Sequence, residues 1–361
     1  MSQTPVPFWF LRGGSSRGPY FRREDLPQDR EQLSQVLMAV VGAGHEINID
    51  GLGGGVAVTT KVAMLSRSAE PGVDLDYFFA QVGVTERIVD YKPTCGNILA
   101  GVGPAGIEMG LVPIQSDVTR VVIRSVNTGA KVEAVIQTPN GAVQYAGDVA
   151  IAGVPGTAAP IALNFMEVVG SSCGALFPTG HRTEVIDGIE VSCMDVAMPV
   201  VMARASDFGL TGYETAEALD ANTAFFVRME SIRREAGKRM GMGDVSASVL
   251  PKFTILAAPS QTGATITARY FMPWKTHPSM AVTGAQCIAS CAVHPGTVAD
   301  GLSVLGHGVP LNVVIDHPSG AIDVLMDFSV DEQRFELKSA GLLRTARLLA
   351  RGEVLVPEGL L

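Results

Sequence analysis

An internal repeat relates the two halves of this 361-residue chain and constrains its fold more than any other feature. In the first half, an apolar stretch at 120–129 ends in glycine, and a stretch of alternating polar and apolar residues follows at 131–137. The same pattern returns in the second half, at 311–320 and 321–326. Each pair of stretches predicts a strand, a turn at the glycine and a return strand.

The segments upstream of these hairpins also correspond, and in the same order. A run rich in small residues at 95–109 matches a similar run at 279–293, and each predicts a helix. Farther upstream, a lysine enters an apolar strand in both halves, Lys61 in the first and Lys252 in the second. The matched segments lie about 185 to 191 residues apart, a period too long for a solenoid, so the pattern indicates duplication of a whole domain.

An amphipathic helix precedes the lysine in both halves, around 29–41 and around 216–237. The chain also exceeds the size at which one core usually keeps growing, which favours two domains. We therefore expect an α+β protein with pseudo-symmetric domains at 1–183 and 184–361, each a strongly curved sheet wrapped around a central helix. Ligand sites favour the cleft between such domains, so we expect the active site there.

The sequence Thr-Cys-Gly-Asn at 94–97 opens the first run of small residues and is the strongest candidate for chemistry. Free backbone N–H groups at a helix start stabilise anions, which suits the Cys95 thiol to acid/base work. The N–H groups of Gly96 and Asn97 can also hold a carboxylate or an enolate oxygen. A free cysteine is commonly a small buried residue of the core, and this alternative stays open for Cys95.

Composition argues against several kinds of partner. A net charge of −9 and the lack of a run of lysine and arginine argue against nucleic acid. The N-terminus lacks a signal sequence and no apolar run is long enough to span a membrane, so we expect a cytoplasmic protein. Five cysteines without regular spacing fit reduced thiols, and six scattered histidines predict no metal site.

Five short motifs, spread over almost the whole chain, carry a family resemblance. They are Arg-Gly-Gly-Ser-Ser-Arg-Gly at 12–18, Asp-Gly-Leu-Gly-Gly at 50–54, Thr-Lys-Val-Ala at 60–63, Cys-Gly-Asn at 95–97 and Arg-Thr-Ala-Arg at 344–347. Together they resemble the PrpF-like isomerases, a family with the diaminopimelate-epimerase-like fold. That family includes 2-methylaconitate isomerases, methylitaconate isomerases, and 4-oxalomesaconate tautomerases and isomerases. The segments 97–104, 172–180 and 242–246 are most similar to the oxalomesaconate enzymes of gallate and protocatechuate breakdown.

The resemblance implies a cofactor-independent isomerase that moves a proton by keto–enol tautomerisation or 1,3-allylic transfer. Its substrate is then an unsaturated tricarboxylate, 4-oxalomesaconate first, with 2-methylaconitate or aconitate as the alternative. No metal and no cofactor are implied, and a homodimer is common in the family. From another functional class, a non-catalytic carboxylate-binding protein would use the same anion-binding residues without a base. A thiol hydrolase using Cys95 or Cys173 with a distant histidine is a further alternative.

The resemblance also implies roles for single residues. It makes Lys61 the base and Cys95 the opposing or assisting acid, whereas position alone favours a surface lysine at a strand end. Arg17 stands where the family has lysine; arginine can bind a carboxylate but cannot transfer a proton at neutral pH. Arg269 and His277 are equally well explained as a solvated strand residue and a structural histidine. The candidates for binding substrate carboxylates are Arg12, Ser15, Ser16, Arg17, Gly96, Asn97, Arg269, His277, Ser279 and Met280.

Overall fold

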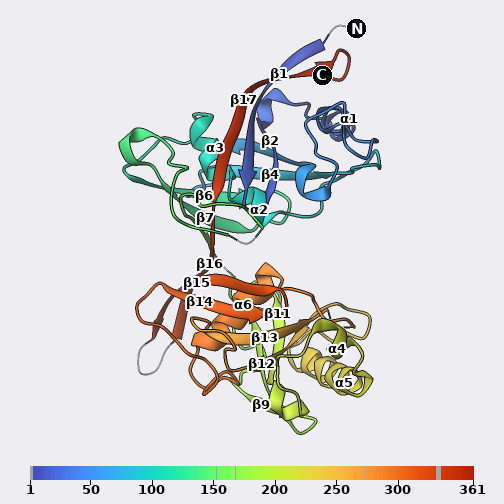
Figure 1. The fold of residues 1–361 in the computed structure, drawn as a ribbon, viewed down its shortest axis with the longest axis vertical. Helices are drawn as coiled ribbons and strands as arrows, with labels where there is room; N and C mark the ends of the chain where they lie inside the picture. Colours follow the sequence, from blue (N-terminus) through green and yellow to red (C-terminus); the bar gives the residue numbers. More distant parts are fainter. Residues whose placement is uncertain (1–2, 152, 167, 273, 331–334) are drawn as a thin grey trace. The chain divides into compact units, whose positions relative to one another are not determined.

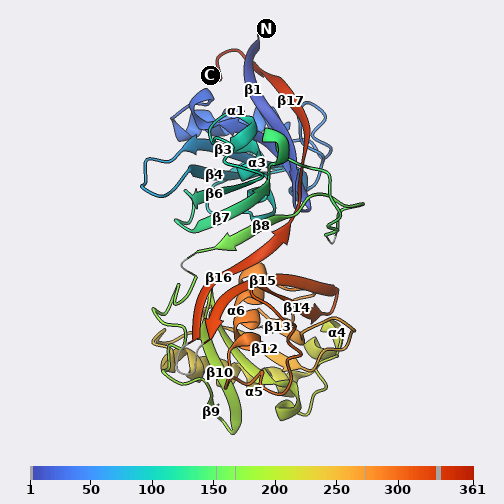
Figure 2. The same cartoon turned by 90° about the vertical axis from the view of Figure 1, so that its left-hand side faces the viewer.

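The computed structural model describes residues 3–151, 153–166, 168–272, 274–330 and 335–361. The chain forms two compact units: unit 1 is Met1–Phe165 with Leu343–Leu361, and unit 2 is Met166–Leu342. This division differs from the predicted boundary between residues 183 and 184. The cause is a long-range pairing, because the last strand, β17 (Ala346–Pro357), runs antiparallel beside the first, β1 (Gln3–Gly13) (Figure 2). The C-terminal strand therefore completes unit 1.

Unit 1 is a curved sheet with helices on both of its faces (Figure 1). Its successive strand pairs alternate between antiparallel and parallel: β1–β2 is antiparallel, β2–β3 parallel, β3–β4 antiparallel, β4–β6 parallel and β6–β7 antiparallel. Its remaining elements are β2 (Ser16–Arg22), α1 (Arg30–Val41), β3 (Lys61–Arg67), β4 (Leu75–Val82), β5 (Val89–Asp90), α2 (Gly96–Leu99), α3 (Val102–Glu108), β6 (Val118–Ser125), β7 (Lys131–Gln137) and β8 (Ile161–Phe165).

Unit 2 repeats this order of strands and helices. The pairs β10–β11, β12–β13 and β14–β15 are antiparallel, and β11–β12 and β13–β14 are parallel, as in unit 1. Its elements are β9 (Glu184–Ile186), β10 (Ile189–Asp195), β11 (Pro199–Arg204), α4 (Ala216–Asp220), α5 (Thr223–Arg239), β12 (Lys252–Ala257), β13 (Ile266–Phe271), α6 (Val282–Val293), β14 (Leu311–His317), β15 (Gly320–Val330) and β16 (Phe335–Arg344). The shared strand order confirms the predicted α+β fold of two similar halves.

The helices that the sheets enclose are built from small residues, which allows close packing. In unit 2, α6 lies among β11, β14 and β15 (Figure 1). Almost all of its side chains are buried. A Cβ atom added to Gly284 would come within 2.5 Å of the Tyr270 ring, so the helix and the sheet approach each other closely at this point. Packing at this density makes the central helix part of the core rather than a surface element.

Three predicted helices differ in detail from the structure. The stretch 95–109 is divided into α2 and α3, because Tyr20 Oη donates to the Ile98 carbonyl and Pro104 has no N–H with which to continue the helical bonds. The stretch 279–293 becomes helical only at Val282, so Ser279 and Met280 precede α6 instead of opening it. The predicted helix at 216–237 is likewise two helices, α4 and α5.

Candidate active site

Lys61 is the first residue of β3 and faces Gln81 of β4 in the strand register. Its Nζ donates to Gln81 Oε1 at 2.8 Å and lies 5.3 Å from the centroid of the Phe79 ring. Because side chains alternate along a strand, Lys61 shares its face with Ala63 and Leu65, which are buried in the core around α2 and α3. The ammonium group is thus half-buried and oriented at the rim of the face that carries these helices.

Cys95 is the N-cap residue of α2, and its thiol is partly buried against the same core. The Cys95 carbonyl accepts from the Leu99 N–H at 2.9 Å and from Tyr77 Oη at 3.4 Å. Tyr77 lies on β4 two residues before Phe79, and the centroids of these two rings are 6.3 Å apart. One row of side chains on β4 therefore joins the surroundings of Cys95 to those of Lys61.

Two buried tyrosines hold the backbone around Cys95. Tyr20 Oη donates to the Ile98 carbonyl at 2.6 Å, and Tyr77 donates to the Cys95 carbonyl. Burial, followed by the nearby Cys95 thiol, raises the pKa of both tyrosines well above its usual value. Both hydroxyls therefore stay protonated near neutral pH, and they act as fixed donors that position the start of α2.

The turn between β1 and β2 lies against the first turn of α2. Asn97 Nδ2 donates to Ser15 Oγ at 3.1 Å. Gly14 has a φ of +52°, and a Cβ atom there would collide with Asn97 Oδ1. Ser16 Oγ is buried and has no hydrogen-bond partner among the described residues. The structure thus brings together Ser15, Ser16 and Asn97, three of the predicted carboxylate-binding residues, beside Cys95.

Arg12 and Arg17 lie directly opposite each other across the β1–β2 pair, so they share one face of the hairpin. Leu11 and Tyr20, on the alternate positions, belong to the core around α2. Both arginines therefore lie on the face opposite to Lys61 and Cys95. Arg17 is exposed and lines a cavity of about 150 Å³ close to the start of β3, together with Arg12, Ser15, Ser16, Thr59 and Val154.

The remaining candidates lie in unit 2, near the start of α6. Arg269 is buried; its Nε donates to the Glu214 carbonyl at 2.7 Å, and burial lowers its pKa against the opposing effects of Glu214 and Asp316. His277 Nδ1 accepts from the Ser279 N–H at 3.0 Å, and burial lowers the pKa of His277. Met280 is buried as well. Arg269 is thus neither a solvated strand residue nor free to rotate.

Two residues missed by the sequence reasoning join these groups. Gln81 fixes the position of Lys61 Nζ by a hydrogen bond. Gln81 could have been identified only from the register of β3 and β4, which the sequence does not give. In unit 2, His317 Nε2 lies 3.5 Å from Ser279 Oγ, and burial lowers its pKa, helped by Arg269 and His277. A single histidine at the end of a strand carries no recognisable signal in the sequence.

Cys173, the other partly exposed thiol, is held by a buried carboxylate. Asp195 Oδ2 accepts from the backbone N–H groups of Ser172 and Cys173 at 2.7 and 2.6 Å. Burial and this carboxylate raise the pKa of Cys173 to about 11. Because the thiolate is the nucleophile, this environment disfavours a thiol hydrolase built on Cys173.

The described residues contain neither a cluster of metal ligands nor a membrane-spanning helix. No group of three or more His, Cys, Asp or Glu side chains is arranged to hold a metal ion in the part of the chain that the structure describes. Within the same residues, no helix is long and apolar enough to cross a membrane.

The lysine and the thiol lie on one face of a curved sheet, beside a set of hydrogen-bond donors. This arrangement is typical of enzymes that move a proton within their substrate. A family model described as "PrpF protein" matches residues 3–357, and the chain belongs to this family.

Relatives cover nearly the whole chain. YbhH of Escherichia coli (strain K12) is 48% identical over 353 residues, 98% of this chain and 99% of that protein, and its name specifies no substrate. The 4-oxalomesaconate tautomerase of Pseudomonas putida is 44% identical over 356 residues, 99% of this chain and 97% of that protein. The crystal structure of methylitaconate-delta-isomerase superposes with a TM-score of 0.88 at 32% identity, over 100% of this chain and 97% of that one. The similarity to named isomerases identifies this chain as an isomerase.

Proposed function

We propose that this protein shifts a proton within an unsaturated tricarboxylate, with 4-oxalomesaconate as the first candidate substrate and with no metal or organic cofactor. The observation that carries the proposal is the placement of Lys61, whose Nζ is fixed by Gln81 on the face that also carries Cys95. The 44% identity to a 4-oxalomesaconate tautomerase supports the choice of substrate.

In this proposal Lys61 is the base. A C–H bond beside a carbonyl or a conjugated acid becomes acidic enough for a side chain to deprotonate when donors stabilise the resulting enolate. The uncharged Lys61 amine takes the proton, and the ammonium group then keeps its bond to Gln81 Oε1 while the enolate persists. Cys95, or the protonated Lys61 itself, then delivers a proton to a different atom of the conjugated system.

Carboxylate binding is assigned to two sets of residues. In unit 1 these are Ser15, Ser16, Arg17 and the backbone N–H groups of Gly96 and Asn97. In unit 2 they are Arg269, His277, Ser279 and Met280. Each set is assigned to carboxylate binding within its own unit, where charged and backbone donors can bond carboxylate oxygens. Arg12 and Arg17 share the face opposite to Lys61. Arg17 is kept in the set because it lines a cavity with Ser15 and Ser16, whereas Arg12 is held by Thr345 and a different role for it is argued below.

The same elementary steps serve a tautomerase and a double-bond isomerase. Both remove a proton from one carbon and return a proton to a different atom of the delocalised anion. The 32% identity and close structural match to a methylitaconate-delta-isomerase favour a 1,3-allylic shift as the second candidate reaction. The two reactions differ in where the new proton appears.

A proton NMR assay in D2O tests the proposal with four compounds: 4-oxalomesaconate, its keto tautomer, 2-methylaconitate and trans-aconitate. We expect turnover of the first pair, with deuterium at the reacting carbon. If only 2-methylaconitate or trans-aconitate is turned over, that compound takes the place of 4-oxalomesaconate as the assigned substrate. If all four compounds bind and none exchanges a proton for deuterium, the protein is a carboxylate-binding protein. The activity should survive exhaustive EDTA treatment, and loss that a divalent metal restores would overturn the metal-free mechanism.

A further inference from the structure

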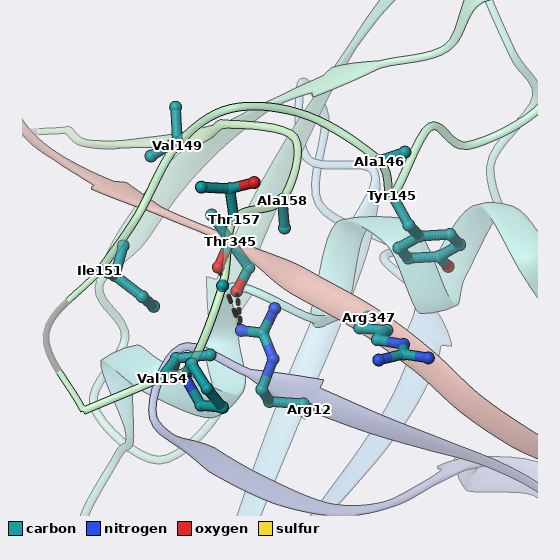
Figure 3. Close-up of a pocket in the computed structure, with 12 residues that line it drawn as sticks. Arg12, Tyr145, Ala146, Val149, Ile151, Val154, Thr157, Ala158, Thr345 and Arg347 are labelled. Carbon is teal, nitrogen blue, oxygen red and sulfur yellow. Dashed lines mark hydrogen bonds between the residues drawn. The ribbon is translucent and has the colours of Figure 1, made fainter.

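A cavity of about 330 Å³ lies in unit 1, outside the group formed by Lys61 and Cys95 (Figure 3). The segment between β7 and β8 forms one wall, and the ends of β1 and β17 form the other. Neither Lys61 nor Cys95 lines it. Its lining residues are Arg12, Tyr145, Ala146, Val149, Ile151, Val154, Pro155, Gly156, Thr157, Ala158, Thr345 and Arg347.

Two arginines face this cavity side by side. Arg12 and Arg347 are directly opposite each other in the β1–β17 pair, so their side chains leave the same face of the sheet. Figure 3 shows the Arg12 guanidinium beside Val154 and Thr345, and the Arg347 guanidinium below Tyr145. Among the described residues that line the cavity, none is acidic. Two like charges thus lie together without a lining carboxylate to balance them.

Most of the hydrogen-bonding capacity of these arginines is unused. Arg12 donates through Nη1 alone, to the carbonyls of Gly14 and Thr345 and to Thr345 Oγ1, at 2.9 to 3.0 Å. Its Nε and Nη2, and the whole Arg347 guanidinium, donate to no acceptor among the residues that the structure describes. Burial lowers the pKa of Arg12, and the charge of Arg347 lowers it further. An anion between the two groups would remove this repulsion.

The opposite wall is apolar. Val149, Ile151, Val154 and Pro155 line it, and the Tyr145 ring closes one side. Tyr145 Oη lies 3.4 Å from Glu108 Oε1, and burial and this carboxylate raise the pKa of the phenol, so the ring stays neutral. Two cationic donors on one wall and aliphatic side chains on the other favour a ligand with one charged end and one apolar end.

We propose that this cavity binds a small organic carboxylate with an apolar tail in addition to the isomerase substrate, beside the smaller cavity of Ser15, Ser16 and Arg17, with which it shares Arg12, Val154 and Pro155. Arg347 and the free N–H groups of Arg12 bind the carboxylate as a fork, and the tail packs against Val149, Ile151 and Val154. Arg12 connects this cavity to the proposed substrate-binding residues, because its Nη1 donates to the carbonyl of Gly14, the residue before Ser15. The inference does not depend on the proposed reaction.

A fluorine NMR titration with 4,4,4-trifluorobutanoate tests the site, using the wild type and two variants of the same strand. Arg347→Gln removes a cavity arginine, whereas Arg351→Gln removes an exposed arginine that does not line the cavity. We expect saturable binding that Arg347→Gln weakens about tenfold and Arg351→Gln leaves unchanged. A response that stays linear up to about 10 mM probe would mean that no specific binding occurs, and it would overturn the proposal. Equal weakening of binding by both variants would overturn it as well.

Two further experiments test which chemical groups the cavity recognises. Ile151→Asp places a carboxylate opposite the arginines and should abolish probe binding with the circular dichroism spectrum unchanged; binding that persists contradicts the site. Inorganic phosphate should compete poorly, because it has no apolar tail, and equal competition would show a simple anion site instead. Arg347→Gln should leave KM for the tricarboxylate within about twofold. A rise in KM parallel to the loss of probe binding would make the cavity part of the substrate site.

Discussion

The proposal that Lys61, and not Lys252, is the base depends on single residues. Lys61 and Lys252 are each the first residue of the corresponding strand, β3 and β12. Lys61 is fixed by a hydrogen bond to Gln81 and lies over the Phe79 ring. Burial lowers the pKa of Lys252, and Arg233 lowers it further. The hydrogen bond and the shared face with Cys95 favour Lys61.

Replacing Lys61 with methionine removes the amine and keeps most of the volume of the side chain. If Lys61 is the base, Lys61→Met should lower kcat by about 10² to 10⁴-fold, the usual worth of general acid–base catalysis. Lys238→Met, on the exposed side of α5, serves as the matched control and should keep full activity. Steady-state kinetics measures both. A Lys61→Met enzyme with more than about a tenth of wild-type kcat would rule out the assignment.

The five cysteines differ in access and in thiol acidity. Cys193, Cys287 and Cys291 are buried, and burial raises the pKa of all three thiols, that of Cys291 to about 12. Burial and Asp195 raise the pKa of Cys173 to about 11. Iodoacetamide should therefore alkylate Cys95 first at pH 7.5, because alkylation needs an accessible thiolate.

A mass-spectrometric time course of peptides measures these rates, and Cys95→Ser confirms which peptide carries the fast label. The tricarboxylate should slow the labelling of Cys95 if the thiol contacts substrate. Equal rates at Cys95 and Cys173, or no protection by any tricarboxylate that binds, would place Cys95 outside the site.

At the scale of elements, the turn between β1 and β2 couples the hairpin to α2. Gly14 has a φ of +52°, and Gly72, in an open turn, has a φ of +78° with open space where a Cβ atom would lie. Gly72→Ala should therefore destabilise the protein by about 1 kcal/mol through backbone strain alone. Gly14→Ala adds a collision with Asn97, so it should destabilise more and also lower kcat/KM.

Urea unfolding and kinetics on the two glycine variants separate these effects. Equal losses of stability would mean that the turn yields without moving Asn97. An unchanged kcat/KM in Gly14→Ala would show that the position of Asn97 does not matter to the reaction.

The sequence predicts elements better than their ends and their partners. The strand that begins at Lys61 follows from its continuous apolar run, and the paired hairpins follow from local alternation and their glycine turns, so both can be found without a structure. The break between α2 and α3 depends on Tyr20, 78 residues away from the carbonyl it binds, and no local pattern contains it. The face on which Arg12 lies depends on strand register, which composition does not determine.

At the scale of the whole chain, the predicted boundary missed that the C-terminal strand returns to β1. Pairing between the two ends of a chain leaves no mark in either segment, so the repeat alone suggested two contiguous halves. The predicted carboxylate-binding residues fall into both units. The role of each set therefore stays a prediction, which kinetics on Ser15→Ala and on Ser279→Ala can test through the rise in KM of each variant.

The two units should also respond differently to pH. Burial lowers the pKa of His277, His294 and His317, all in unit 2. Folding keeps these rings neutral, whereas the same rings in the unfolded chain bind protons below a pH of about 6.5. The contribution of the three histidines to stability is therefore complete above that pH, and it is lost as the pH falls through their pKa values in the folded state. The unfolding midpoint of unit 2 in urea should thus drop between pH 7.5 and 5.5.

The two tryptophans report on the units separately, because Trp9 belongs to unit 1 and Trp274 to unit 2. Trp9→Phe leaves fluorescence from unit 2, and Trp274→Phe leaves fluorescence from unit 1. We expect the drop in the urea midpoint to be larger in Trp9→Phe than in Trp274→Phe, and to shrink when His317→Gln is added to Trp9→Phe. Burial raises the pKa of Glu214, but several hydrogen bonds, first those from Thr211, together lower it by more. The stability that such carboxylates contribute is therefore lost only at lower pH. Equal drops in both reporters would mean that the buried histidines do not control the pH dependence.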